Sequence, residues 1–120
     1  MQTDHAVEAL SALAQGTRLE TFRLLVKHEP AGLAAGDVAR AMGVPQNTMS
    51  SHLRVLAQAG LVSGERQSRS IVYRARLDRF RDLTLHLIQD CCGGDPSLCG
   101  SLVADLTPSC APQETANACC

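Results

Sequence analysis

The sequence has almost no aromatic residues: no tryptophan, one tyrosine and two phenylalanines among 120 residues. Since aromatic side chains dominate many cores, a core here must be built from leucine, valine, isoleucine and alanine. No segment approaches the roughly 20 consecutive apolar residues that a membrane-spanning helix needs. The amino terminus, MQTDHAVEAL, lacks the charged and apolar regions of a secretory signal. These absences predict a cytoplasmic protein that does not bind a membrane.

Cysteine is absent from the first 90 residues, yet six cysteines follow: Cys91, Cys92, Cys99, Cys110, Cys119 and Cys120. Nothing in the sequence indicates secretion, and cytosolic thiols are normally kept reduced. The clustering therefore predicts local thiol chemistry added to a domain that folds without it, rather than a disulfide framework.

Lysine and arginine are absent from residue 82 to the end, a stretch that carries five acidic residues. Residues 64–81, in contrast, hold six arginines and two acidic residues, although the net charge of the whole chain is only -1. A polyanion such as DNA would be attracted to residues 64–81 and repelled by the acidic region that follows.

Length and composition indicate one globular domain, which we place at residues 1–106, followed by a mobile cysteine-containing tail at 107–120. The expected helices cover residues 4–14, 17–28, 36–42, 45–59 and a last segment from about residue 78, and the expected strands cover 61–66 and 70–75. Apolar residues recur at helical spacing on the four longer helices: Val7, Leu10 and Leu13 or Ala14; Leu19, Phe22, Leu25 and Val26; Met49, Leu53 and Leu56; and Phe80, Leu83 and Leu87. The predicted fold is mainly α with a small β-hairpin.

The order of elements is typical of DNA-binding proteins: a short helix, a turn at Gly43, a helix with an exposed polar face, then an arginine-bearing hairpin. Gln46 and Asn47 can contact adenine edges, and Arg66 and Arg69 flank a hairpin tip that can enter the minor groove. The other candidate DNA-binding residues are Thr48, Ser50, Ser51, His52 and Arg54. Taken separately, each element could be an ordinary solvated surface; their order favours double-stranded DNA as the partner.

Three segments carry a resemblance to a known family: LAQGTRLETFRLL, DVARAMGVPQNTMSSHLRVLAQAGLV and GERQSRSIVYRARL. Together they resemble the ArsR/SmtB family of metal-responsive winged helix-turn-helix repressors over roughly residues 10–77. The resemblance implies a homodimer packed through the first and last helices. It also implies binding to a palindromic operator and repression of a resistance operon.

The sensor sites of this family differ between branches. An arsenic-sensing branch carries Cys-x-Cys before the recognition helix, where this chain has Ala34 and Gly36. A zinc-sensing branch begins its site with Asp-x-His, and the nearest match here, Asp82-x-Thr84, lacks the second half of that site. A third branch joins a vicinal cysteine pair at the end of the last helix to one further cysteine, which Cys91, Cys92 and Cys99 resemble.

The chemistry of these three cysteines fits a soft ion. Gly93 and Gly94 allow the chain to double back and bring Cys99 toward the vicinal pair. Three thiolates without a nearby histidine suit trivalent arsenic or antimony, whereas tetrahedral zinc needs a fourth ligand. The predicted function is an operator-binding repressor that dissociates when the metalloid binds, with no organic cofactor. Whether Cys110, Cys119 or Cys120 contributes stays open.

Alternatives remain for the cysteines. They could form a disulfide in a peroxide- or sulfide-sensing repressor of the same fold, or serve as small apolar residues without a sensing role. A thiol-dependent arsenate reductase is a more remote alternative. It lacks a glycine-rich phosphate loop, and no histidine or arginine stands beside the cysteines to activate one. We therefore expect a protein that is not an enzyme.

Overall fold

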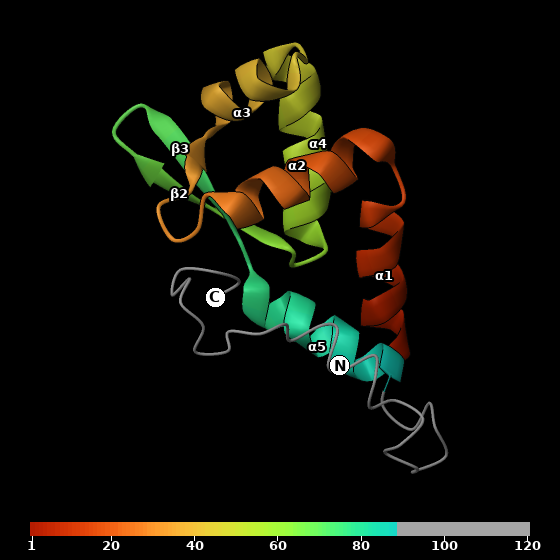
Figure 1. Cartoon of the computed structure of the whole chain (residues 1–120). Coiled ribbons are helices and arrows are strands. Elements are labelled where there is room, and N and C mark those ends of the chain that lie inside the picture. The colour runs from red at the N-terminus through yellow and green to blue at the C-terminus, as the bar shows by residue number, and fades with distance from the viewer. Residues whose placement is uncertain (89–120) are drawn as a thin grey trace, which may run out of the picture. The chain divides into compact units, whose positions relative to one another are not determined.

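The computed structural model describes residues 1–88 and contains five helices and three strands in that range (Figure 1). They are α1 (Thr3–Leu13), α2 (Gly16–Lys27), β1 (Leu33–Ala34), α3 (Ala35–Met42), α4 (Gln46–Gln58), β2 (Val62–Gln67), β3 (Ser70–Ala75) and α5 (Leu77–Ile88). The predicted mainly α fold with a hairpin is confirmed.

The predicted tail at residues 107–120 lies outside the described residues. No helix within residues 1–88 is long and apolar enough to cross a membrane.

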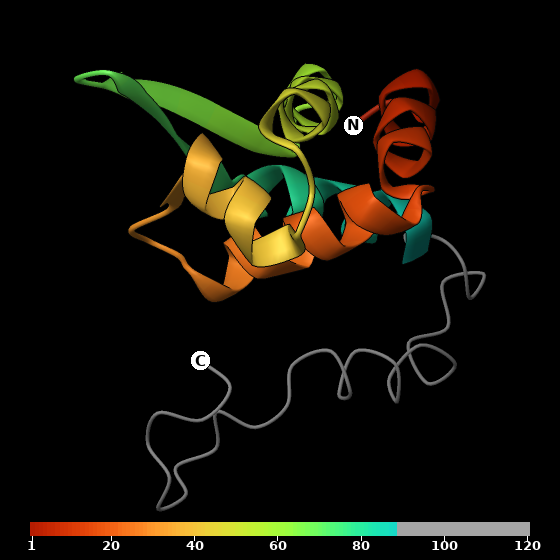
Figure 2. The same cartoon turned by 90° about the horizontal axis from the view of Figure 1, so that it is seen from above.

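The hairpin belongs to a three-stranded antiparallel sheet with the order β1-β3-β2. The third strand, β1, pairs Leu33 with Tyr73 and was not predicted, because two residues are too few to show the alternation typical of a strand. From this sheet the β2–β3 hairpin extends outward beside α4, as Figure 2 shows. Ser68, at φ +58°, lies in the turn that joins the two strands.

The core is centred on α4. Met49, Leu53 and Leu56 are fully buried, as their helical spacing predicts. Phe22 and Leu25 of α2 belong to the same core. The core also contains a buried polar side chain, Thr21, whose hydroxyl donates a hydrogen bond to Sδ of Met49 at 3.8 Å. This packing fixes the rotation of α4 and therefore determines which of its side chains face outward.

The prediction of which face of α1 is buried is wrong. Val7 and Leu10 are 54% and 42% exposed, and the buried face consists of Ala6, Ala9 and Ala12. Small side chains let a helix approach its neighbours closely, so the alanines take the inner face and the larger side chains remain outside. An apolar surface is therefore left uncovered on α1.

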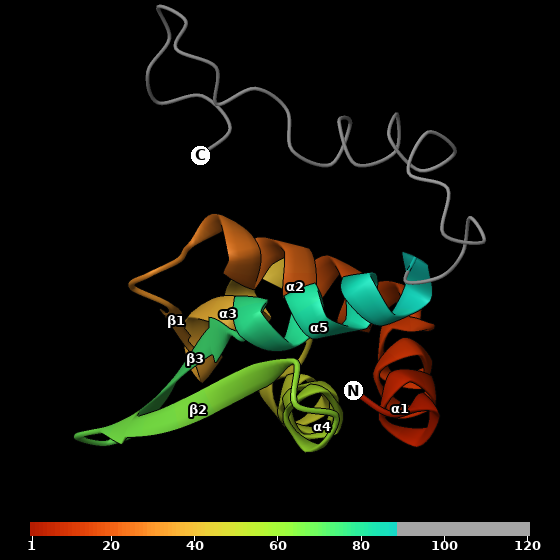
Figure 3. The same ribbon diagram turned by 90° about the horizontal axis from the view of Figure 1, so that it is seen from below.

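The stripes of α2 and α5 need a similar correction. Leu19 and Val26 of α2 are exposed, as are Phe80 and Leu87 of α5, whereas Leu83 is buried. Phe80 still contacts the core, because its ring centroid lies 5.5 Å from that of Phe22. This contact joins α5 to α2, which run next to each other in Figure 3.

Two glycines with positive φ offer a matched test of the fold. Gly32 (φ +78°) lies so close to β3 that a Cβ would stand 2.6 Å from the Tyr73 carbonyl oxygen, whereas Gly43 (φ +66°) has nothing within 4 Å of that position. We expect Gly43→Ala to cost about 1–2 kcal/mol of unfolding free energy, the price of a left-handed backbone. Gly32→Ala should cost about 3 kcal/mol, since backbone must also move. Urea unfolding of both variants measures the difference, and equal losses would contradict the close approach.

Candidate nucleic-acid interface

The turn between α3 and α4 sets the direction of α4. Gly43 adopts the left-handed conformation that ends α3, and the Val44 N–H donates to the Ala39 carbonyl at 3.0 Å. Pro45 follows in an extended conformation as the N-cap residue, so α4 begins at Gln46. Two helices joined by this short turn, with α4 packed on α2 and α3, form a helix-turn-helix.

The polar residues of α4 lie on its outer face. Six of the predicted DNA-binding residues are exposed and His52 is half-buried, while the intervening Met49 and Leu53 are buried. The exposed six are Gln46, Asn47, Thr48, Ser50, Ser51 and Arg54. The structure thus presents these side chains together on one surface.

Two neighbouring amides on this surface differ in their hydrogen bonds. Oδ1 of Asn47 accepts from the Thr48 N–H at 2.9 Å, and the Asn47 carbonyl accepts from the Ser51 hydroxyl at 3.4 Å. Oδ1 of Asn47 therefore already accepts one hydrogen bond from within the chain. The Gln46 side chain makes no hydrogen bond within residues 1–88, which leaves both its donor and its acceptor available.

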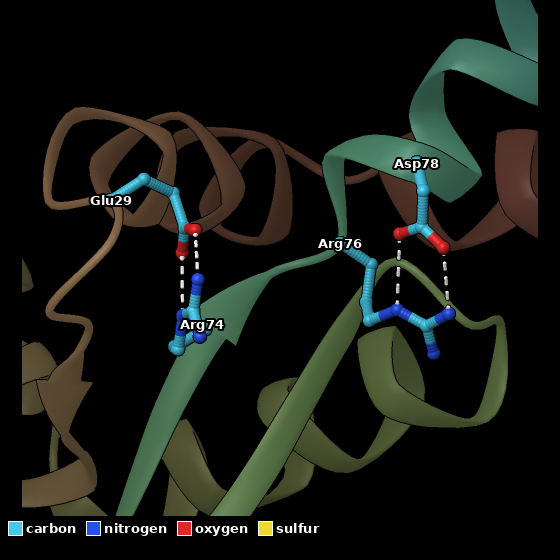
Figure 4. Close-up of polar contacts among 4 residues, drawn as sticks. All are labelled: Glu29, Arg74, Arg76 and Asp78. Atoms are coloured by element: carbon cyan, nitrogen blue, oxygen red, sulfur yellow. Dashed lines mark hydrogen bonds and ion pairs between the residues drawn. The ribbon is translucent and has the colours of Figure 1, made fainter.

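The arginines of residues 64–81 divide into paired and unpaired groups, so the sequence overestimated the free positive charge. Arg74 forms two hydrogen bonds with Glu29, at 2.8 and 3.3 Å, and Arg76 forms two with Asp78, at 2.9 and 3.2 Å (Figure 4). By contrast, Arg66 and Arg69 are exposed and make no ion pair within the described part of the chain. Within residues 1–88, the arginines of this segment without an ion pair are therefore Arg66 and Arg69 at the hairpin tip and Arg79 and Arg81 on α5.

The two paired arginines hold the base of the hairpin. The hydrogen bonds and negative charge of Glu29 raise the pKa of Arg74, and the hydrogen bond from Arg76 lowers the pKa of Asp78. Glu29 follows α2 in sequence and its side chain is only 16% exposed. The pair therefore connects the segment after α2 to β3, although its 45-residue separation gives no signal in the sequence.

The start of α5 contacts the end of α4. The Arg76 N–H donates to the Leu61 carbonyl at 2.7 Å. Next to it, the Arg79 side chain covers Gly60, where a Cβ would stand 2.8 Å from the Arg79 Nε. A guanidinium at the carboxyl end of a helix also interacts favourably with the helix dipole. A movement at the start of α5 would consequently be felt at the end of α4.

A hollow of about 220 Å³ lies between α4 and the hairpin. Its lining comes from the start of α3, the first turns of α4 and the strand β3 with the preceding turn: Ala35, Gly36, Gln46, Ser50, Arg69, Ser70, Ile71 and Tyr73. Three of these, Gln46, Ser50 and Arg69, were predicted to bind DNA. The other lining residues could not be predicted from the sequence, because the hollow forms only where three elements meet.

The predicted sensor residues Cys91, Cys92 and Cys99 lie outside the described residues, as do Cys110, Cys119 and Cys120. Within residues 1–88, no three histidine, cysteine, aspartate or glutamate side chains form a group that could hold a metal ion.

A helix-turn-helix followed by a protruding hairpin defines a winged helix-turn-helix fold, in which the β2–β3 hairpin is the wing. A family model described as a helix-turn-helix domain matches residues 13–65. The transcriptional regulator NmtR of Mycobacterium tuberculosis is 44% identical over 64 residues, covering 53% of this chain and 51% of NmtR. The nodulation protein NolR of Rhizobium meliloti is 35% identical over 86 residues, covering 72% of this chain and 67% of NolR.

A solved structure gives the same result. The homodimeric winged helix-turn-helix DNA-binding domain of Mb0332 from Mycobacterium bovis, described as a possible ArsR-family transcriptional regulator, superposes with a TM-score of 0.60. It is 30% identical, with 71% of this chain and 77% of that one covered. The chain therefore belongs to the ArsR/SmtB family of winged helix-turn-helix transcriptional regulators, and its match spans only about half the length of NmtR. NmtR and Mb0332 are described as transcriptional regulators, in agreement with the prediction of a protein that is not an enzyme.

Proposed function

We propose that this protein is a transcriptional repressor that binds operator DNA as a homodimer and releases it on binding trivalent arsenic or antimony. The observation that carries the DNA-binding part is the outward polar face of α4 beside a wing whose Arg66 and Arg69 have no acidic partner within residues 1–88. In this arrangement α4 enters the major groove, and the wing contacts the neighbouring backbone and minor groove.

The proposed dimer uses the apolar surface that the fold leaves open. Val7 and Leu10 on α1 and Leu85 on α5 are exposed, and α5 runs toward α1 in Figures 1 and 3. The homodimeric state of the Mb0332 domain supports the same assembly here. A two-fold axis through this surface would place two copies of α4 about 34 Å apart, one turn of DNA.

The proposed sensor is the group of thiolates from Cys91, Cys92 and Cys99. In sequence, Cys91 follows the last residue of α5, Ile88, by three positions. Metalloid binding would change the end of α5 and with it the dimer interface. Since Arg79 at the start of α5 covers Gly60 at the end of α4, the same change would shift the recognition helices. A binding preference of about 1–3 kcal/mol for the state that does not bind DNA weakens operator affinity roughly 5- to 150-fold.

Replacing Gln46 tests whether α4 reads bases. On an operator selected by the full chain from a random duplex library, Gln46→Ala should weaken binding about a hundredfold, because the dimer loses one base contact in each half-site and a bidentate contact contributes about 1–3 kcal/mol. A second selection with the variant should lose preference at one base pair of each half-site. Gln58→Ala, which changes another exposed glutamine at the far end of α4, is the control and should change neither result. An unchanged preference after Gln46→Ala would contradict the proposed reading, and a selection without enrichment would contradict DNA recognition itself.

A further inference from the structure

We propose that the hollow between α4 and the wing is a seat for one phosphodiester of the operator backbone, held by Arg69, Ser50 and Ser70. This inference rests on the proposed DNA binding and goes beyond it by assigning Arg69 to a phosphate rather than to the minor groove. Ser70, which the sequence did not single out, also becomes a DNA ligand.

The chemistry of the lining selects an anion. Arg69 has no acidic partner within residues 1–88, and no acidic side chain lines the hollow. Ser50 comes from α4 and Ser70 begins β3, so hydroxyl donors are present on both sides of the space. Guanidinium and hydroxyl groups are among the donors that proteins use to bind DNA phosphates.

The size and the remaining lining fit a nucleotide backbone. The volume of about 220 Å³ is many times the ~10–15 Å³ that admits one water molecule, so a phosphate group has room in the hollow. The apolar wall of Ala35, Ile71 and Tyr73 offers contact for the adjoining deoxyribose. Gln46 lines the same hollow, next to the bases that its amide is proposed to read.

The hollow lies where a strand of the DNA backbone would pass. With α4 in the major groove and the wing tip at the adjacent minor groove, the backbone that separates the two grooves has to cross the space between them. The hollow lies there: Ser50 lines it from α4, and Ser70, next to the hairpin turn, and Tyr73 line it from β3. Arg66 does not line the hollow and is left for contact at the wing edge.

A methylphosphonate scan of the selected operator tests the seat. Each duplex carries one neutral linkage, and its affinity is measured for the full-length protein and for Arg69→Gln. One linkage per half-site should weaken wild-type binding about tenfold, as expected for loss of a charge-assisted contact, and should leave the variant's affinity unchanged. The variant's plot of log K against log salt should also be shallower by about two units, since each protomer of the dimer loses one phosphate contact.

Arg66→Gln is the matched control, since it removes the same charge from the wing without touching the hollow, and it should remain sensitive at that linkage. Ser70→Ala should weaken binding at the same linkage with less effect on the salt slope. If every linkage costs wild type and Arg69→Gln equally, the seat is wrong even though DNA binds. If Arg69→Gln loses base preference while its salt slope stays unchanged, Arg69 contacts the minor groove and not a phosphate.

The same lining chemistry could take a free anion instead. Sulfate or inorganic phosphate is therefore titrated at constant ionic strength while the backbone amide signals of Gly36 and Ser70 are followed by NMR. If the hollow binds an operator phosphate, we expect the free anion to bind weakly, to require Arg69 and to compete with the operator. Free-anion binding with a flat methylphosphonate scan would overturn the backbone assignment in favour of a small-anion site.

Discussion

The double variant Val7→Glu/Leu10→Glu is expected to be a folded monomer that binds the selected operator about a hundredfold or more weakly than the wild-type chain. Both side chains already face solvent in the protomer, so charging them leaves the buried alanine face of α1 intact. Placing four carboxylates in a two-fold interface would disrupt it, and a dimer that reads two half-sites gains about 10²- to 10⁴-fold from linkage alone. Sedimentation and fluorescence anisotropy measure the two effects.

Val26→Glu is the control for this prediction. Val26 is 37% exposed at the end of α2, outside the surface proposed for the dimer, so the variant should remain a dimer with wild-type affinity. Circular dichroism should show the same helical content for both variants. A double variant that stays dimeric, or a monomer that retains operator affinity, would contradict the proposed interface.

Replacing any one of Cys91, Cys92 and Cys99 by serine is expected to abolish release of DNA by arsenite while leaving operator affinity unchanged. Trivalent arsenic takes three soft ligands, and two thiolates with one hydroxyl bind it far less well. Arsenite should lower the operator affinity of the wild type by roughly 5- to 150-fold, which corresponds to an allosteric coupling of about 1–3 kcal/mol. It should not change the operator affinity of any of the three variants. Anisotropy with and without arsenite, in buffer containing a non-thiol reductant, provides the measurement.

Cys110→Ser and Cys119→Ser test whether these cysteines contribute, and loss of arsenite release in either variant would add that residue to the site. Equal release by arsenite from all three sensor variants would show that the ligands are assigned wrongly. If peroxide releases the DNA and arsenite does not, the protein is a redox sensor that works through a disulfide. Release by zinc or cadmium alone would point to a site with a fourth ligand.

Much of the fold could be predicted because local and tertiary preferences agree. In α4, Met49, Leu53 and Leu56 repeat at helical spacing and are all buried, and Gly43 and Pro45 mark the turn before it. Once that stripe is assigned to the core, the outward position of Gln46 and its neighbours follows. The candidate DNA surface on α4 was predictable for this reason.

The features that could not be predicted depend on contacts distant in sequence. Helical spacing on α1 is satisfied equally by the alanine face and by Val7 and Leu10, and only the closeness of the neighbouring helices decides between them. The Glu29–Arg74 pair and β1 both require the segment after α2 to lie against β3. The hollow likewise forms only where α3, α4 and the wing meet.

The central claim is that one chain couples operator binding to capture of a soft metalloid ion. Its most direct test is the affinity of the full-length, reduced protein for its selected operator, measured by anisotropy while arsenite is added up to one ion per proposed sensor site. We predict high affinity without arsenite and a fall of at least about fivefold that saturates near that stoichiometry. An affinity that does not change as arsenite is added would contradict this account.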